Sequence, residues 1–294
     1  MIAHPRLRAA PLLPRATLPD RRLPFGRHAP LRRNTLTGDI MTLSADLSGK
    51  RMLITGASSG LGSHFARVAA RAGASIVVAA RRQDRLEALV EELLGLGAPK
   101  AAALALDVGD GAAIHACLAD AVSKLGGLDI LVNNAGIARA GLAVDQTAED
   151  FDAVMSVNLR GVWLMAISAA RHWRETGTPG NIVNIASILG ERVSMGTACY
   201  AVSKAGVVQM TRALALEFAR LNVRVNALEP GYFETEINQG YFDTDAGKAM
   251  IRQVPMRRIG HYEDLDGPFL LLASDASRFM TGAAIPVDGG HMLA

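Results

Sequence analysis

The chain has 294 residues, half of them hydrophobic and a fifth charged, which is enough for one large α/β domain or two small ones. Its two cysteines, Cys117 and Cys199, are too few for a disulfide-stapled secreted scaffold, and no apolar run reaches the ~18–20 residues that span a bilayer. The seven histidines lack metal-ligand spacing. We therefore expect a cytoplasmic protein with no metal site and no membrane partner.

The charge is concentrated at one end of the chain. Residues 1–40 hold eight arginines, no lysine and two acidic residues, a net charge of +6, whereas residues 41–294 carry a net charge of −3. The weakly acidic larger part gives no reason to expect a nucleic-acid partner.

Residues 1–40 also hold six of the twelve prolines and show no helical or strand periodicity. The favoured interpretation is a disordered basic extension, ahead of a natural start at Met41. Two alternatives are a basic arm for an acidic partner and an organelle targeting peptide, although a targeting peptide should be serine-rich and the first serine is Ser44. Residues 41–294 are interpreted as a single domain.

From Lys50 onward, short apolar β-branched runs alternate with segments of helical period. This alternation predicts an α/β fold, a Rossmann-type doubly wound parallel sheet of about seven strands with helices on both faces. The predicted strands are Arg51–Thr55, Ser75–Ala79, Ala102–Leu106, Ile130–Asn133, Asn181–Ile185, Val223–Leu228 and Ala284–Val287. The predicted helices include Leu61–Ala72, Arg82–Leu96, Ala112–Leu125, Phe151–Arg174 and Ala198–Leu221.

A glycine-rich turn joins the first strand to the first helix. Gly56 permits the tight turn, Gly60 lets the backbone approach a pyrophosphate, and Gly62 lets helix and strand pack closely. The spacing is GxxxGxG rather than the GxGxxG of the dinucleotide fingerprint, so the turn alone is a weak signal.

The end of the second strand favours NADP(H) over NAD(H). An NAD site needs a carboxylate there, but the chain offers Ala80 followed by Arg81 and Arg82. Two arginines at a helix start, each unfavourable by ~0.3–1 kcal/mol, suggest a compensating anion such as a 2′-phosphate. We expect the arginines to bind that phosphate; the alternative is an ordinary solvated helix start.

Tyr200 and Lys204 are four residues apart in a predicted helix and so share one face. A nearby ammonium favours the phenolate, which would lower the pKa of the tyrosine toward the range of a general acid/base. Ser187, at the end of a predicted strand, could donate a hydrogen bond to a substrate carbonyl.

Together these motifs resemble the short-chain dehydrogenase/reductase superfamily over about residues 48–292. The motifs, in the family's order, are the turn Thr55–Gly62, Asp107, the run Asn133–Gly136, Asn158, Ser187, Tyr200, Lys204, Pro230-Gly231, Thr235 and Asp288–Gly290.

The resemblance implies an oxidoreductase that moves a hydride between a nicotinamide and a carbonyl or alcohol. It implies that Tyr200 transfers the proton, that Lys204 holds the ribose and lowers the tyrosine pKa, and that Ser187 polarises the carbonyl. Asn158 would hold a water of a proton relay, and Asn133 would brace neighbouring strands.

The resemblance also implies a set of cofactor-binding residues. They are Gly56, Ser58, Ser59, Gly60, Leu61, Gly62, Arg81, Asp107, Val108, Asn134, Ala135, Gly136, Tyr200, Lys204, Pro230, Gly231 and Thr235. Ser59 stands where many NADP members carry a second basic residue, so one of two NADP marks is present.

The segment Tyr232–Arg258 holds four of the fourteen aromatic residues, and these either cap an apolar substrate pocket or pack a short helix onto the domain. The aromatic and methionine residues concerned are Tyr232, Phe233, Tyr241, Phe242, Met250 and Met256. Glu234 and Glu236 would discourage an anionic substrate if they face inward.

The overall pattern is similar to 3-oxoacyl-carrier-protein reductases and, as the alternative, to sugar or sugar-acid dehydrogenases. A non-catalytic NADP-binding regulator is a third hypothesis. A carrier-protein partner would need a basic patch, for which Arg139, Arg171 and Arg174 are candidates. The resemblance implies a small-molecule carbonyl or alcohol substrate and a homo-oligomer, a tetramer or a dimer.

Overall fold

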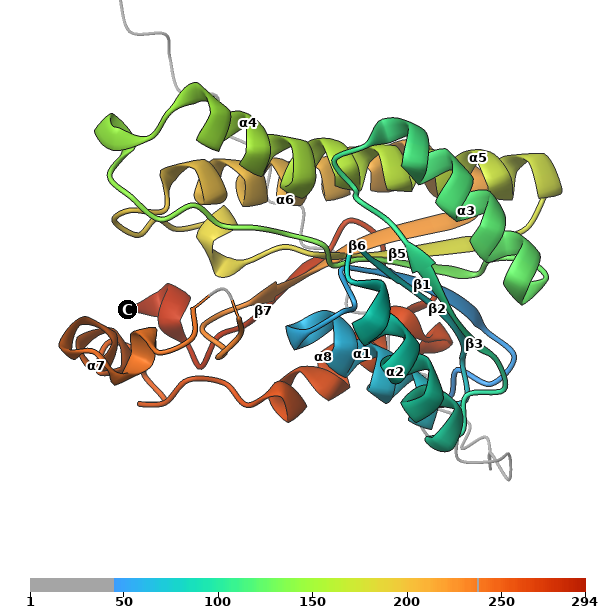
Figure 1. Ribbon diagram of the computed structural model, residues 1–294, viewed down its shortest axis with the longest axis horizontal. Helices are drawn as coiled ribbons and strands as arrows, with labels where there is room; N and C mark the ends of the chain where they lie inside the picture. Colours follow the sequence, from blue (N-terminus) through green and yellow to red (C-terminus); the bar gives the residue numbers. More distant parts are fainter. Residues whose placement is uncertain (1–44, 237) are drawn as a thin grey trace, which may run out of the picture. The chain divides into compact units, whose positions relative to one another are not determined.

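The computed structural model describes residues 45–236 and 238–294, so the expected extension 1–40 lies outside the described residues. The described chain forms a seven-stranded parallel sheet in the order β3-β2-β1-β4-β5-β6-β7, which confirms the predicted fold class (Figure 1). The strands are β1 (Arg51–Thr55), β2 (Ser75–Ala80), β3 (Ala101–Ala105), β4 (Ile130–Asn133), β5 (Gly180–Ile185), β6 (Val223–Pro230) and β7 (Ala284–Val287).

Helices cover both faces of this sheet. On one face lie α1 (Gly60–Arg71), α2 (Gln83–Gly95) and α8 (Asp266–Ala273), and on the other lie α3 (Gly111–Leu125), α5 (Val162–Thr176) and α6 (Ala198–Phe218). Two further helices are α4 (Ala148–Met155) and α7 (Asp245–Ile251).

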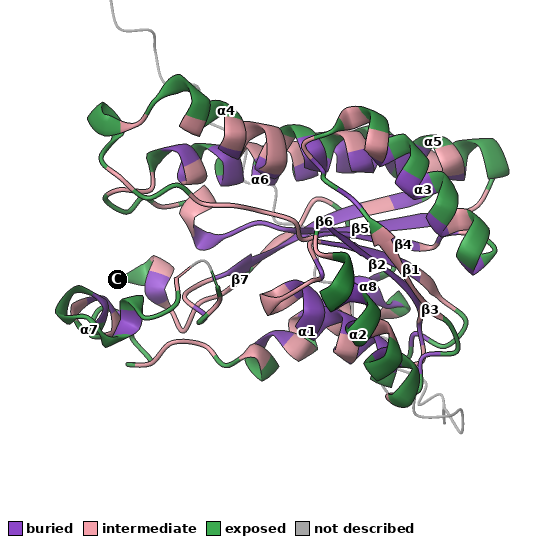
Figure 2. Cartoon of the chain, viewed as in Figure 1, coloured by how far each residue is buried: buried purple, intermediate pink, exposed green. Residues whose placement is uncertain are grey.

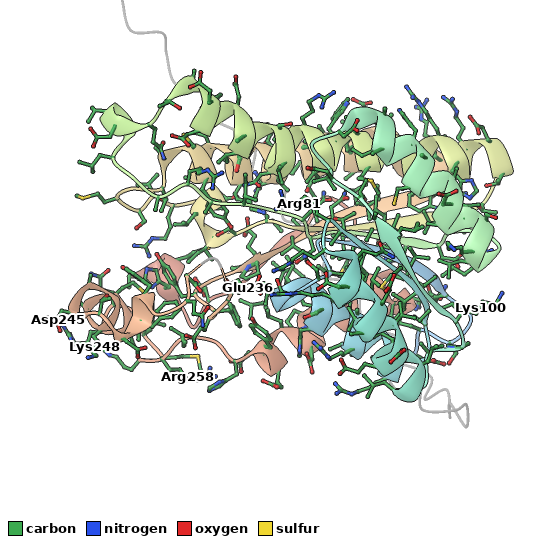
Figure 3. The ribbon with its side chains drawn as sticks, in the orientation of Figure 1. Arg81, Lys100, Glu236, Asp245, Lys248 and Arg258 are labelled. Atoms are coloured by element: carbon green, nitrogen blue, oxygen red, sulfur yellow. The ribbon has the colours of Figure 1, made fainter. Side chains whose placement is uncertain are left out.

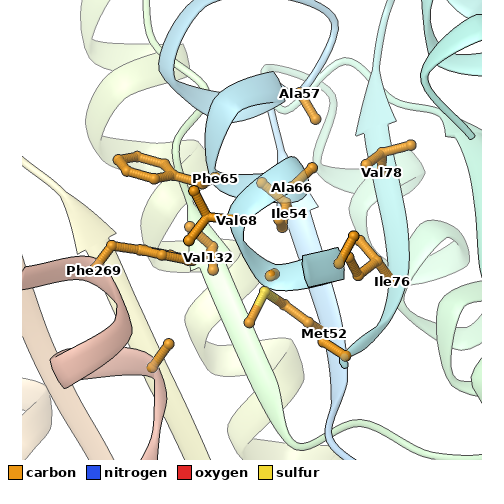
Figure 4. Packing of buried hydrophobic residues seen from close by; sticks show 14 of the residues in the cluster. Met52, Ile54, Ala57, Phe65, Ala66, Val68, Ile76, Val78, Val132 and Phe269 are labelled. Carbon is orange, nitrogen blue, oxygen red and sulfur yellow. The ribbon is translucent and has the colours of Figure 1, made fainter. Parts of the chain in front are cut away.

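Each strand feeds two hydrophobic cores because successive side chains point to opposite faces of a sheet. In β1, Met52 and Ile54 join the core under α1 and α8, while Leu53 joins the core under α3 and α5. Figure 2 shows the buried residues concentrated on the sheet and on the inner sides of the helices. Figure 4 shows the first core, in which the Phe65 and Phe269 rings stack with centroids 4.5 Å apart.

The predicted helix Phe151–Arg174 was wrong in detail. It is α4, then a π-helical turn at Ser156–Gly161, then α5. The apolar pattern cannot distinguish these, because one wide turn barely changes the helical period. By length and composition alone, the stretch Ala148–Thr176 could cross a membrane, with a mean hydropathy of 1.4; half of its most apolar window is buried within the protein.

The two tryptophans of the chain lie on α5 in different surroundings. Trp173 is fully buried and its indole N–H donates to the Leu128 carbonyl at 2.7 Å, whereas the Trp163 side chain is 44% exposed. The buried ring therefore ties the C-terminal end of α5 to the amino end of β4.

Candidate active site

A cleft of about 710 Å³ lies at the carboxyl ends of the strands, where β1 and β4 are neighbours and the strand order reverses. Open parallel sheets bind ligands at this switch point. Nearly all predicted site residues line this cleft: Gly56, Ser58, Ser59, Gly60, Leu61, Arg81, Asp107, Val108, Asn134, Ala135, Gly136, Ser187, Tyr200, Lys204, Pro230, Gly231 and Thr235. Two do not, Gly62 and Asn158, which lie behind its wall.

The glycine turn has no room for side chains. A Cβ on Gly56, where φ is +67°, would lie 2.6 Å from the Ala135 Cα, and a Cβ on Gly62 would lie 2.4 Å from the Asn134 amide nitrogen. At Gly60, where φ is +56°, a Cβ would make only ordinary contacts at 3.8 Å, with the Thr235 side chain and the Tyr262 hydroxyl. At Gly56 and Gly62 the turn therefore packs tightly against Asn134 and Ala135, the segment after β4, and a side chain at either position would have to displace that segment.

Asn134 and Thr55 hold the turn in place. The Asn134 amide donates to the Thr55 and Gly56 carbonyls at 3.1 and 3.0 Å, and the Thr55 hydroxyl accepts from the Asn134 and Ala135 backbone N–H groups. Asn134 thus contributes to the cleft by supporting its floor.

Asn133 points away from the cleft and braces the sheet. Its amide donates to the Asn184 side chain on β5 at 3.0 Å, and Asn184 donates to Thr211 on α6 at 2.9 Å. This confirms the structural role predicted for Asn133.

The catalytic end of the cleft is formed by Ser187, Tyr200 and Lys204, at the end of β5 and in the first turns of α6, with Asn158 of the π-helical turn behind its wall. Lys204 donates to the Ile185 carbonyl at 2.7 Å, and its Nζ lies 5.6 Å from the centroid of the Tyr200 ring. Ser187 forms a hydrogen bond with the Tyr200 side chain. The three polar groups predicted from the sequence therefore meet at one wall.

Burial dominates the electrostatics of this end. It raises the pKa of Tyr200 to about 12, against a smaller lowering by the Ser187 hydrogen bond, and it lowers the pKa of Lys204 to about 8. The expected lowering of the tyrosine pKa is therefore wrong for this structure, because desolvation disfavours both charged forms. A phenol with this pKa is fully protonated at neutral pH, the form that donates a proton.

Asn158 lies in the π-helical turn between α4 and α5 and is completely buried. Its side chain accepts from the Ile137 N–H at 2.8 Å and donates to the Ile137 carbonyl at 2.9 Å and to the Ser203 hydroxyl at 3.0 Å. It therefore joins the segment after β4 to α6, one residue from Lys204. The wide turn places this side chain between the two segments, which fits the occurrence of π-turns at functional sites.

The arginine end of the cleft, formed by Ser58, Ser59, Arg81 and Arg82, contains a guanidinium that the family resemblance did not select. Arg82 donates to the Ser58 hydroxyl at 3.1 Å and to the Ser59 hydroxyl at 2.7 Å. Arg81 is exposed, lines the same cleft, and has no ion-pair partner among residues 45–236 and 238–294. The doubled arginine was visible in the sequence, but only the fold shows which guanidinium contacts the glycine turn.

Glu236 also reaches the arginine end. From the sequence it was considered only as a residue that would discourage an anionic substrate if it faced inward. Its carboxylate accepts from the Ser59 hydroxyl at 2.8 Å and from Arg82 at 2.9 Å, and it pairs with Arg85 as well. Figure 3 labels Arg81 and Glu236, which line one cleft although about 150 residues separate them. Glu234 is exposed and does not line the cleft.

The aromatic segment after β6 divides between the two predicted roles. Tyr232, Phe233 and Tyr241 line the cleft, as a lid would. Phe242 instead packs with Met250 and Val254 in a small separate core. Met256 is exposed and lines a neighbouring pocket.

The prediction of a basic patch near the cleft is wrong for Arg171 and Arg174, and only Arg139 lies there. Arg139 lines the cleft, with its guanidinium 3.6 Å from the Asp150 carboxylate. Arg171 and Arg174 flank Trp173, which bonds to Leu128 ahead of β4, so they lie at the amino ends of the strands. Helices that cover parallel strands run antiparallel to them, which takes the end of α5 away from the cleft.

Comparisons with known proteins agree with this geometry. The family model described as enoyl-(acyl carrier protein) reductase matches residues 56–292. The 3-oxoacyl-[acyl-carrier-protein] reductase of Thermotoga maritima is 38% identical over 247 residues, which cover 84% of this chain and 99% of that protein.

Solved structures share the fold at similar identity. A short-chain type dehydrogenase/reductase from Mycobacterium marinum is 39% identical with a TM-score of 0.82, over 86% of this chain and all of that one. A gluconate 5-dehydrogenase from Burkholderia cenocepacia, in complex with NADP and tartrate, is 36% identical with a TM-score of 0.81, over 85% and 98% of the two chains.

Proposed function

The chain belongs to the short-chain dehydrogenase/reductase superfamily, and from this premise we propose that it is an NADP(H)-dependent oxidoreductase acting on a carbonyl or secondary alcohol. One observation carries the proposal: Ser187, Tyr200 and Lys204 meet on the wall of a cleft whose other end holds the glycine turn and Arg82.

The cleft residues fit a dinucleotide. The glycines leave the turn without side chains at its tightest positions. The volume of the cleft, about 710 Å³, is in the range of cofactor sites. Ser58, Ser59 and Arg82 would hold a 2′-phosphate, with Arg81 beside them, and the start of α1 would face the pyrophosphate. Ala80 provides no carboxylate for a ribose 2′-hydroxyl, and the gluconate 5-dehydrogenase noted above has NADP bound.

When bound, the nicotinamide supplies or accepts the hydride. In reduction, Tyr200 donates its phenolic proton to the carbonyl oxygen, while the Ser187 hydroxyl donates a hydrogen bond to the same oxygen as negative charge develops. Lys204 stabilises the resulting phenolate through its ammonium, and the Ile185 carbonyl fixes the position of that ammonium. In oxidation the proton moves in the opposite direction.

For the substrate we propose a 3-oxoacyl thioester. Met195 lines the cleft and is 87% exposed, and Val193, two residues earlier in the chain, is 84% exposed. The Gly141 N–H donates to the Gly196 carbonyl at 3.0 Å, which joins two cleft-lining segments, and Leu142 and Val144, which follow Gly141 in the chain, are exposed as well. An acyl or pantetheine chain would cover this apolar surface, whereas a sugar would not.

A sugar-acid dehydrogenase is the second candidate. Arg139 lines the cleft and is half exposed, and its ion pair at 3.6 Å is loose enough for it to bind a substrate carboxylate instead. The gluconate 5-dehydrogenase structure lends this candidate weight.

The test compares the two candidates in one assay. We expect NADPH oxidation with a short 3-oxoacyl thioester at a kcat/KM at least ten times that for any sugar acid assayed with NADP⁺. Turnover of a sugar acid without turnover of the thioester would establish the second candidate. Nucleotide binding without any turnover, with cellular function preserved in Tyr200→Phe, would establish the non-catalytic regulator.

We propose further that the protein is a cytoplasmic homo-oligomer, a tetramer or a dimer. Phe151, Trp163, Val202 and Leu216 expose 41% to 81% of their surface along α4, α5 and α6, which lie side by side in Figure 1. Such apolar residues favour a self-association surface. Light scattering should give a mass of two or four chains, and Leu216→Arg should lower it.

A further inference from the structure

A carboxylate from the segment after β6 sits among the donors of the arginine end. Glu236 accepts from three groups on two elements: the Ser59 hydroxyl at 2.8 Å, Arg82 at 2.9 Å and Arg85 at 2.5 Å. These contacts lower the pKa of Glu236 to about 2, so the group is anionic at neutral pH.

This donor set is that of a phosphate site. Two guanidinium groups and a hydroxyl converge on one anion, and Ser59 is the N-cap of α1. An N-cap hydroxyl usually accepts from its own helix, but Ser59 makes no such side-chain bond and donates to Glu236. The helix start is thus left to an outside anion.

The bound carboxylate can be displaced. The Arg82 and Glu236 side chains are 40% and 46% exposed, and ion pairs this accessible to water are individually weak. A phosphate near −2 charge, with three acceptor oxygens, can use the same guanidinium groups and gain more from them.

The backbone segment that bears Glu236 also supplies residues to the substrate side of the cleft. It follows Thr235, whose side chain lies 3.8 Å from where a Gly60 Cβ would be, and it comes four residues after cleft-lining Tyr232. The Tyr262 hydroxyl donates to the backbone carbonyl of Glu234 in the same segment, at 2.7 Å. The segment therefore spans from the substrate rim to the arginine end, with the carboxylate as its far anchor.

We propose that Glu236 determines cofactor specificity as an internal competitor: its carboxylate occupies the pocket of the cofactor 2′-phosphate and is displaced when that phosphate binds. The proposal rests on the function proposed above. It implies that NADP(H) frees the 232–236 segment, whereas NAD(H), which has no 2′-phosphate, leaves it anchored. By linkage, whatever releases the anchor also tightens binding of the phosphate.

The first measurement is calorimetric titration of the full chain with 2′,5′-ADP and, separately, 5′-AMP, neither of which has a nicotinamide. Glu236→Gln keeps the size of the side chain and removes its charge. We expect it to lower the Kd of 2′,5′-ADP about five- to tenfold, the loss of one exposed charge competitor, and to change the Kd of 5′-AMP less than twofold. Glu234→Gln is the matched control, since that exposed neighbour does not touch the pocket, and it should change neither constant.

The second measurement is hydrogen exchange of the backbone amides at 232–236. Saturating 2′,5′-ADP should speed exchange there in the wild-type protein, 5′-AMP should not, and Glu236→Gln should exchange fast without any nucleotide. This readout reports the anchor itself rather than affinity.

The outcomes separate the two proposals. Binding of 2′,5′-ADP to the wild-type protein that Glu236→Gln leaves unchanged or weakens would overturn the competitor and retain the NADP(H) site. Equal tightening of both nucleotides would also overturn it, because the effect would then be general electrostatics. If neither 2′,5′-ADP nor 5′-AMP binds to the wild-type protein or to Glu236→Gln, both proposals are overturned.

Discussion

At the catalytic end of the cleft, Lys204 is 4% exposed and Asn158 is completely buried, whereas at the arginine end Arg82 and Glu236 expose 40% and 46% of their side chains. The first end is held by short hydrogen bonds to backbone atoms, and the second by ion pairs between side chains. Removing a partner from a buried polar network is costly, while an exposed ion pair rearranges cheaply. The chemistry thus depends on groups with one fixed arrangement, and cofactor choice depends on groups that can exchange partners.

Removal of the proton donor tests the catalytic end most directly. Tyr200→Phe should lower kcat about 10²- to 10⁴-fold, the usual contribution of a positioned general acid, with Kd for NADPH changed less than about threefold. Single-turnover NADPH oxidation and fluorescence titration measure the two quantities. Loss of binding together with turnover would mean that the tyrosine mainly supports the cleft.

Glu229 is a buried carboxylate apart from the catalytic groups, and its burial affects the pH dependence of stability. It is 2% exposed, and burial, followed by the charge of Glu191, raises its pKa to about 7. A raised folded-state pKa gives stability that is present below about pH 4.5 and lost as the pH rises through about 7. Glu229→Gln should therefore stabilise the protein at pH 8 by on the order of 2 kcal/mol and have little effect at pH 4.5.

Urea denaturation at the two pH values measures this difference. Asp84→Asn, an exposed carboxylate at the start of α2, is the control and should change stability by less than about 0.5 kcal/mol at either pH. A stabilisation from Glu229→Gln that is equal at both pH values would contradict the titration and indicate a packing effect.

The pH profile of reduction tests the buried ammonium. Burial lowers the pKa of Lys204 to about 8, so its charge is present below that value and lost above it. The rate constant of reduction should be constant near pH 7 and fall up to tenfold per pH unit above about 8. Lys204→Met should lower the rate at pH 7 and abolish this alkaline limb; a limb that persists in the variant would belong to another group.

The arginine end contributes to cofactor affinity through exposed charges. Arg82→Ala should raise the Kd of NADPH about five- to tenfold, and the loss should shrink in 0.5 M salt, because the site is exposed. Arg81→Ala is the comparison, and its effect decides whether the neighbouring cation shares the phosphate. Neither variant should change the Kd of NADH more than about twofold.

The sequence predicted the part of the molecule that depends on local pattern. The alternation of strands and helices predicted the sheet, and most of the motifs after β1, β3, β4, β5 and β6 came together in the cleft, because the carboxyl ends of parallel strands share one edge. The motif Asp288–Gly290 after β7 does not line this cleft. Three features depended on distant packing instead. The π-helical turn around Asn158, the direction of the Tyr200 pKa shift and the pairing of Glu236 with Arg82 each require knowing what lies across the fold.

The different surroundings of the two tryptophans provide separate optical reporters. Trp173, enclosed and hydrogen-bonded to Leu128, should emit at short wavelength and be shielded from iodide until the sheet comes apart. Trp163 is 44% exposed on the face assigned to self-association, so it should emit at longer wavelength and be quenched by iodide only in the separated subunit. Dilution and denaturant should therefore change different parts of one emission spectrum, and each tryptophan serves as the internal reference for the other.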